Sequence, residues 1–168
     1  KAVAYLQKAL KYLEDNNGKE HPKYKILLHN LALTTMENKP KYSQGIYLSL
    51  LKETYKNLHE DLPYQSASVR LNSIYKDKFT PDAYLYTFQN EAGAKLALFA
   101  RLNRHGLLQE IERKHSILFN SSSDSKPKRE RIRSLISEIS SINIKPERRR
   151  LLKKEKDKLI EDLKSTLP

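Results

Sequence analysis

The fold is decided by the stretch GKEHPKYKILLHNLAL, Gly18 to Leu33, which places a glycine and a His-Pro pair directly before an apolar run of helical period. Gly18 follows an Asp-Asn-Asn segment and can adopt the left-handed conformation that ends a helix. Pro22 suits the first turn of a helix, where a missing N–H costs nothing. The stretch therefore predicts that one helix, over about 1–15, ends here and that a second begins.

A second proline-led segment, LPYQSASVRLNSIY, contains Pro63, 41 residues after Pro22. A helix–turn–helix unit that repeats at such a spacing is typical of an α-solenoid, in which neighbouring units bury one another's faces. No segment has the alternation of a strand, so we predict an all-α fold. Further helices are expected at about 42–60, 64–76 and 107–119, around Ile132 to Ile139, and from Pro146. One or two helices are expected from Pro81, with Thr80 as the cap; if there are two, they divide at Gly93.

The residues around the first junction resemble the tetratricopeptide repeats of the kinesin-light-chain type. GKEHP matches the family's LGKDHP loop, LLHNLA at Leu27 to Ala32 matches the LNNLA start of a unit, and KPKY resembles the turn between its helices. The likeness covers about residues 1–80 and departs at Lys52 and Asn72, where small residues are expected. It implies antiparallel helix pairs stacked as a short solenoid, with a generic helical bundle as the alternative. The charge distribution adds a basic C-terminal helical segment.

The same resemblance implies a non-enzymatic module that holds an acidic or extended peptide of a partner protein in a groove. Asn30 matches the family asparagine that bonds a peptide backbone, and Arg70 stands at the equivalent place in the next unit. Lys25 and His29 lie close to Asn30 on the same expected helix. We therefore expect a peptide site at these four residues, with the alternative that Asn30 only faces solvent or ties helices together.

Composition and charge limit the domain organisation and the partners. The chain has 168 residues, no cysteine and a formal charge of +12, which favours acidic partners and a cytoplasmic protein without disulfides. We expect a helical-repeat domain at 1–119, a serine-rich loop at 120–127 and a basic helical extension or cap at 128–168. Because the chain begins at Lys1 without a leader, we expect a fragment of a larger protein.

Basic residues concentrated after position 125 support an alternative function, peripheral binding to anionic phospholipid headgroups such as phosphoinositides. In that reading the LALF segment at Leu96 to Phe99 inserts at the membrane interface beside flanking bases. RNA or DNA binding is a third reading, although acidic residues at helical spacing among the bases favour a solvated helix. The expected anion-binding residues are Lys95, Arg101, Arg104, Lys126, Lys128, Arg129, Arg131, Arg133, Arg148, Arg149 and Arg150.

Catalytic patterns are absent from the sequence. The five histidines are scattered without an HxxxH or HExxH pair, and there is no glycine-rich phosphate loop, GxSxG motif or cysteine nucleophile. Adjacent acids such as Glu60 and Asp61 point in different directions on a helix and do not suggest a general acid–base pair. We therefore predict no enzymatic activity, no metal site, no cofactor and no small-molecule substrate.

Overall fold

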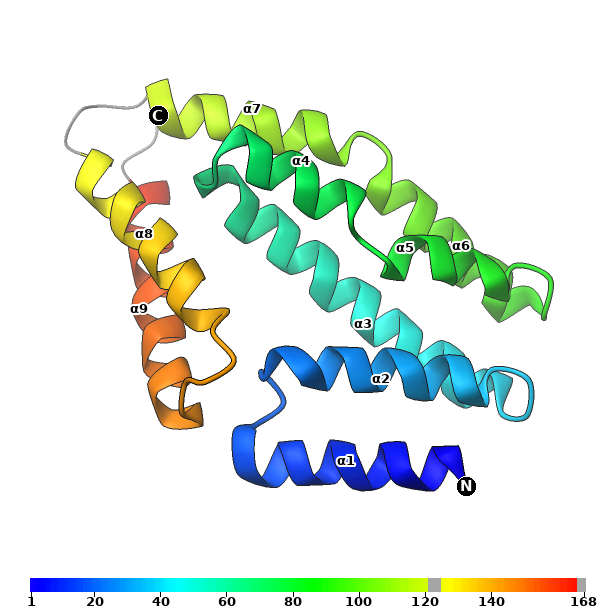
Figure 1. Cartoon of the computed structure of the whole chain (residues 1–168). Helices are drawn as coiled ribbons and strands as arrows, with labels where there is room; N and C mark the ends of the chain where they lie inside the picture. The colour runs from blue at the N-terminus through cyan, green and yellow to red at the C-terminus, as the bar shows by residue number, and fades with distance from the viewer. Residues whose placement is uncertain (121–124, 166–168) are drawn as a thin grey trace.

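The computed structural model describes residues 1–120 and 125–165, and within them every regular element is helical (Figure 1). This confirms the all-α prediction. The elements are α1 (Ala2–Asn17), α2 (Pro22–Thr35), α3 (Pro40–Asp61), the 3₁₀ turn η1 (Leu62–Tyr64), α4 (Ala67–Tyr75), α5 (Phe79–Ala83), the 3₁₀ turn η2 (Tyr84–Tyr86), α6 (Glu91–Arg104), α7 (Leu107–Asn120), α8 (Lys126–Ile139) and α9 (Pro146–Lys164).

The first junction lies where its sequence predicts. α1 ends at Asn17, Gly18 follows with a positive φ of 74° and an extended ψ of 161° rather than the left-handed helical conformation, and α2 starts at Pro22. The backbone N–H of Lys23 donates to Nδ1 of His21 at 3.2 Å, so the histidine side chain caps the new helix. α1, α2 and α3 then run side by side in alternating directions (Figure 1).

The long helix α3 carries the main core. Its Tyr47, Leu51 and Tyr55 are buried in one core cluster together with residues from α2, α4, α5, η2, α6 and α7. The tyrosine hydroxyls are satisfied inside this core: that of Tyr55 donates to the carbonyl of Ala100 at 3.0 Å. The large apolar bodies and the satisfied polar ends let tyrosine serve here as a core residue. We call α1 to α7 the helical body.

After α3, two helices begin at residues other than those predicted. The expected helix at 64–76 begins at Ala67, after η1, with the Ser66 hydroxyl accepting from the N–H of Val69 at 3.4 Å. The next helix starts at Phe79, and its N–H donates to the Asp77 carboxylate at 3.0 Å. Asp77, rather than Thr80, therefore caps this helix, because an acidic side chain two residues earlier reaches the free N–H first.

The break predicted at Gly93 is wrong. The chain turns between η2 and Asn90, and Gly93 lies inside α6, buried against the backbone of η2. A Cβ added at Gly93 would lie 2.1 Å from the carbonyl oxygen of Tyr86. Glycine is needed at this position for close approach of two backbones and not for a turn.

α8 and α9 form an antiparallel pair, the C-terminal hairpin, that lies across the ends of the body helices (Figure 1). Its Ile132, Ile160 and Leu163 pack with Tyr64 of η1 and Leu118 of α7 in a second, smaller core. α8 already begins at Lys126, within the expected loop at 120–127, and residues 121–124 and 166–168 lie outside the described residues.

Candidate functional site: an apolar groove beside α6

Small residues bring η2 and α6 into close contact. Gly93 has no side chain that would collide with the Tyr86 carbonyl. The Asn90 side chain caps α6 by accepting a hydrogen bond from the N–H of Gly93 at 3.0 Å. On the inner side, the Gln44 amide of α3 donates to the side chains of Gln89 and Asn90, both at 3.2 Å. The turn between η2 and α6 is thus fixed to the central helix.

This approach leaves a groove of about 530 Å³ on the outer side of the pair. Ala94 and Ala97 keep its floor low, because their short side chains do not fill the space between η2 and α6. The tyrosine of η2 and the leucine of α6 form apolar walls. The groove residues are Tyr84, Thr87, Ala94, Ala97, Leu98 and Arg101, and we call this surface the α6 groove.

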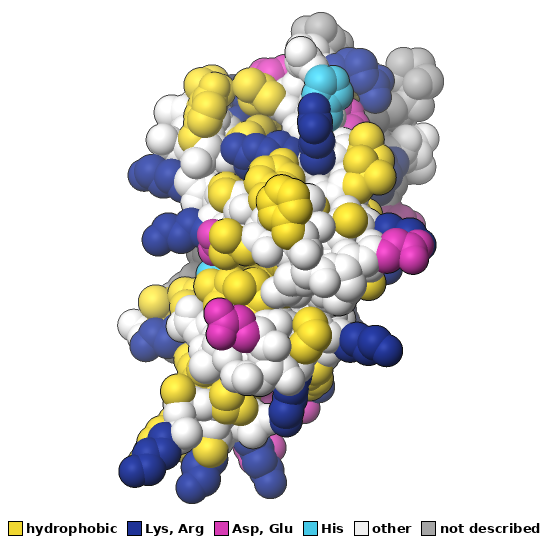
Figure 2. Space-filling view, turned by 90° about the vertical axis from the view of Figure 1, so that its right-hand side faces the viewer, with side chains coloured by type: hydrophobic (Ala, Val, Ile, Leu, Met, Phe, Trp, Pro, Cys, Tyr) yellow, Lys and Arg dark blue, Asp and Glu magenta, His cyan; other side chains and the backbone are white. Residues whose placement is uncertain are grey.

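Large apolar side chains remain exposed in and near the α6 groove. Leu98 is 54% exposed and Leu102, one turn further along α6, is 63% exposed. Phe88, at the turn before α6, is 96% exposed. Figure 2, which views the molecule from this side, shows hydrophobic side chains gathered between Lys and Arg side chains at the edges. Contiguous apolar surface bordered by charge is typical of an interaction site.

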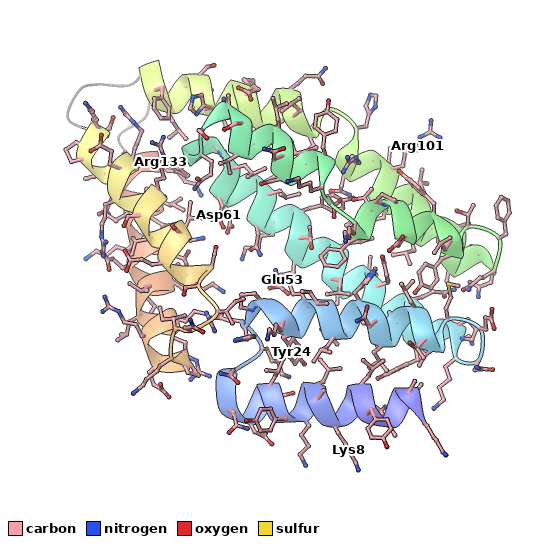
Figure 3. The ribbon with its side chains drawn as sticks, in the orientation of Figure 1. Lys8, Tyr24, Glu53, Asp61, Arg101 and Arg133 are labelled. Carbon is pink, nitrogen blue, oxygen red and sulfur yellow. The ribbon has the colours of Figure 1, made fainter. Side chains whose placement is uncertain are left out.

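The charge beside the α6 groove is basic. Glu91 is the only acidic residue between Ala83 and Arg104, and its carboxylate contacts Lys95 at 2.6 Å in a pair that is exposed on both sides. Such an exposed pair is weak and opens easily. Arg101 has no ion pair with any described residue and points away from the helices (Figure 3). A negatively charged ligand therefore finds two available cations here.

Arg70, predicted to contact a peptide, has an internal role in the structure. It is 4% exposed, and its guanidinium donates to both oxygens of Glu112 on α7, at 2.8 and 2.7 Å, and to the carbonyl of Gln65 at 2.5 Å. This bidentate pair holds α4 to α7. A peptide carboxylate would have to displace Glu112, so Arg70 is not a free groove residue.

The other predicted peptide residues do not form one polar surface. Lys25 of α2 pairs with Glu53 at 3.1 Å, on the side of α3 that faces α2 (Figure 3). Asn30 is exposed on α2. His29 is largely buried and lies between Asp82 and Tyr47, at 3.1 and 3.2 Å.

His29 belongs to an internal hydrogen-bond chain. Its ring also stacks at a tilt against Phe79, with 5.1 Å between centroids. Burial lowers the pKa of the His29 imidazole, and the Asp82 carboxylate opposes this shift. The Tyr47 hydroxyl donates to the Phe79 carbonyl at 3.1 Å, and burial raises its pKa. A buried tyrosine with its proton committed to a backbone carbonyl is a packing element and a poor nucleophile.

Several of the predicted anion-binding residues are used inside the protein. Arg149, 1% exposed, donates to the carbonyls of Ile139 and Ser141, while Arg129 donates to the Leu118 carbonyl and the Ser125 hydroxyl.

Other predicted anion-binding residues lie nearer the surface. The guanidinium groups of Arg104 and Arg131 pair with carboxylates. Arg133 bonds the Tyr64 carbonyl at 2.9 Å, and Lys128 is half-buried. The exposed members of the predicted set are Lys95, Arg101, Lys126, Arg133, Arg148 and Arg150.

The predicted membrane segment is divided between the core and the surface. Leu96 and Ala97 are buried, and Phe99 is half-buried, whereas Leu98 faces outward. Within residues 1–120 and 125–165, no helix has the length and apolarity needed to cross a membrane, and no three metal-ligating side chains converge.

The helical period of the apolar residues after Pro81 predicted helices here but did not indicate the α6 groove. The available signal was that α6 has leucine or phenylalanine at positions 96, 98, 99 and 102 and alanine at positions 92, 94, 97 and 100, which together lie on every side of the helix. An apolar residue on every side of a helix indicates either complete burial or a bound partner. The periodic pattern alone does not distinguish these two outcomes.

Comparisons with known proteins identify no relative: no protein-family model, curated protein or solved structure matches this chain significantly. The tetratricopeptide resemblance therefore stays a prediction from the residues of the first junction.

Proposed function

We propose that this chain is a helical interaction module that binds an acidic, apolar-containing segment of a partner protein in the α6 groove. The observation that carries the proposal is the exposed apolar surface of Leu98 and Leu102 beside Arg101, which has no ion pair among the described residues. Apolar side chains of the partner would bury the leucines, and its carboxylates would pair with Arg101 and Lys95.

The groove favours a partner segment that has both apolar and acidic side chains over a purely acidic one. Its walls are mostly apolar, so burying them supplies the binding free energy, while the flanking cations orient the ligand and speed its association. This replaces the predicted peptide site at Asn30 of α2 and Arg70 of α4 with one built by η2 and α6.

A direct test uses two fluorescein-labelled peptides of equal negative charge, one with leucine and phenylalanine between its acids and one with serine in their place. Fluorescence anisotropy should show binding of the first peptide only. Leu98→Asp and Arg101→Glu should each weaken it at least about tenfold, or about 1.4 kcal/mol. Both side chains are exposed, so circular dichroism should show unchanged helix content.

The matched control is Leu151→Asp on α9, where an exposed leucine lies far from the groove in sequence and in the fold (Figure 1). It should bind the peptide like the unaltered protein. Equal binding by all variants, or no preference for the apolar peptide, would overturn the proposal.

A second candidate function, attachment to an anionic membrane, is favoured by Phe88, whose ring is almost fully exposed beside a basic surface. Aromatic side chains flanked by bases suit the membrane interface. Flotation with phosphatidylserine vesicles separates the two functions. Loss of flotation in Phe88→Ser, with peptide binding absent, would assign the surface to a membrane.

A further inference from the structure

A second groove, of about 500 Å³, shares no lining residue with the α6 groove and lies where the end of α3 and η1 meet α7 and α9. Neither the proposed function nor the sequence patterns use it. We call it the α7–α9 groove. Its volume lies within the roughly 300 to 1,000 Å³ that small-molecule sites commonly have.

The floor of the α7–α9 groove is apolar and continuous with the second core. Tyr64, Leu118 and Ile160 are buried members of that core, and Pro63 lies beside them. Ile117 of α7 is 42% exposed on the open side. A ligand lying on this floor would therefore extend the existing apolar core and remove Ile117 from water.

The rim of the groove carries four cations from three helices. Lys56 and Lys114 have acidic neighbours, at 3.9 Å from Glu60 and 2.9 Å from Glu110. Arg113 of α7 and Lys164 of α9 have no ion pair with any described residue. Among the described residues that line the groove, Glu60 is the only one with a carboxylate, so the rim has an excess of positive charge.

A histidine between α3 and α7 adds an unused polar atom to the rim. Nδ1 of His59 is buried and has no hydrogen-bond partner among the described residues, and the nearest carboxylate oxygen, that of Glu110, is 3.6 Å away. Buried polar atoms normally have partners. Because this atom has almost no accessible surface, a ligand oxygen or water would satisfy it only after a rotation of the His59 ring.

We propose that the α7–α9 groove binds a single-chain anionic amphiphile, with its hydrocarbon chain on Ile117 and Ile160 and its charged group at Arg113 and Lys164. A small inorganic anion would leave the apolar floor uncovered, and an uncharged chain would leave the rim cations unpaired. A concave site between helices suits one monomer, because a bilayer surface requires side chains that project outward.

Binding in this groove would also hold the C-terminal hairpin to the body, because the lining residues come from both. Ile160 and Lys164 belong to α9, whereas Arg113 and Ile117 belong to α7. A ligand that requires both sides binds only the docked state and stabilises it by mass action. Its binding should therefore slow hydrogen exchange in α8 and α9.

The experiment titrates the whole chain with dodecanoate below its critical micelle concentration, with dodecanol as the uncharged counterpart. Calorimetry should detect dodecanoate binding at least tenfold tighter than dodecanol binding, with slower amide exchange in α9. Arg113→Glu and Ile117→Asp should each weaken dodecanoate binding at least tenfold. Arg101→Glu and Leu98→Asp, equivalent changes at exposed residues of the α6 groove, should leave it unchanged.

Equal affinity for dodecanoate and dodecanol, equal loss in all four variants, or no binding would overturn the proposal. Binding of phosphatidylglycerol vesicles without dodecanoate binding would assign the basic rim to a membrane surface instead. The labelled acidic peptide competing with dodecanoate would assign the groove to a protein partner. Because the α6 groove variants are the controls here, failure of this proposal is distinguishable from failure of the proposed function.

Discussion

The helical body and the C-terminal hairpin are held together by different kinds of interaction. The body core consists of interlocking apolar and tyrosine side chains, and its buried polar groups, such as Ser43 and Thr80, are mostly neutral. The hairpin contributes three residues to a small core and buries three cations, of which Arg129 and Lys156 bond to the body whereas Arg149 bonds to carbonyls of the hairpin itself. The body therefore depends mainly on hydrophobic burial, whereas hairpin docking combines a small apolar contact with charged side chains that have polar partners.

This difference predicts that truncating a core residue of the body destabilises the whole fold, whereas truncating one of the hairpin mainly weakens hairpin docking. Leu51→Ala in the body should reduce the free energy of unfolding by about 2 to 5 kcal/mol, because Leu51 is fully buried and its removal leaves a cavity. Leu163→Ala, in the hairpin core, should mainly release the hairpin. Urea unfolding measures the first effect, and hydrogen exchange resolved by helix measures the second.

The control for this pair is Leu151→Ala, at an exposed leucine of α9, which should change neither quantity by more than about 0.5 kcal/mol. If Leu163→Ala lowered the stability of the body as much as Leu51→Ala does, the two regions would form one cooperative unit and the distinction would be wrong.

The second prediction concerns the ion pair that joins the hairpin to α3. Lys156 of α9 is buried, and its ammonium contacts the Asp61 carboxylate at 2.5 Å. Asp61→Ala would leave that charge without its partner, so hairpin docking should weaken by about 2 to 3 kcal/mol, less than for a fully buried pair because Asp61 is partly exposed. Hydrogen exchange in α9 measures the loss.

Lys156→Met is the informative comparison for Asp61→Ala. It removes the buried charge, keeps most of the packed stem and leaves Asp61 partly solvated, so docking should stay close to that of the unaltered protein. Equal losses in the two variants would show that the attraction itself, rather than an uncompensated charge, determines docking.

Local sequence signals account for most of the helices in both regions. Gly18, Pro22 and Pro146 mark helix ends and starts where the structure has them, because their backbone constraints act without tertiary partners. The prediction failed at Gly93 and Thr80. At Gly93 the reason for the glycine is the Tyr86 carbonyl across a turn, and at Thr80 a preceding Asp77 takes the capping role.

The functional residues were harder to predict, because whether a charged side chain is free to contact a ligand depends on partners that are distant in sequence. Arg70 pairs with Glu112, 42 residues later, and Arg149 donates to the carbonyls of Ile139 and Ser141 at and just after the end of α8. No local pattern distinguishes these arginines from Arg101, which has no such partner among the described residues. The overall positive charge was therefore a poor guide to which cations can meet a ligand.

The smallest predicted effect is at the turn where the GKEHP stretch contacts the hairpin. His21 is buried there with Nε2 at 3.3 Å from the Ile142 carbonyl, and Lys153 pairs with Glu20 at 2.7 Å. Because Lys153 and Glu20 are both partly exposed, Lys153→Ala should weaken docking by no more than about 1 kcal/mol.

Salt provides the check on this last pair. At high ionic strength the Lys153–Glu20 attraction is screened, so the difference in α9 exchange between Lys153→Ala and the unaltered protein should disappear. The less exposed Lys156–Asp61 pair should keep most of its effect under the same conditions. A Lys153→Ala effect that persists at high salt would mean that the lysine stem, by packing against the turn, holds the hairpin at this point rather than its charge.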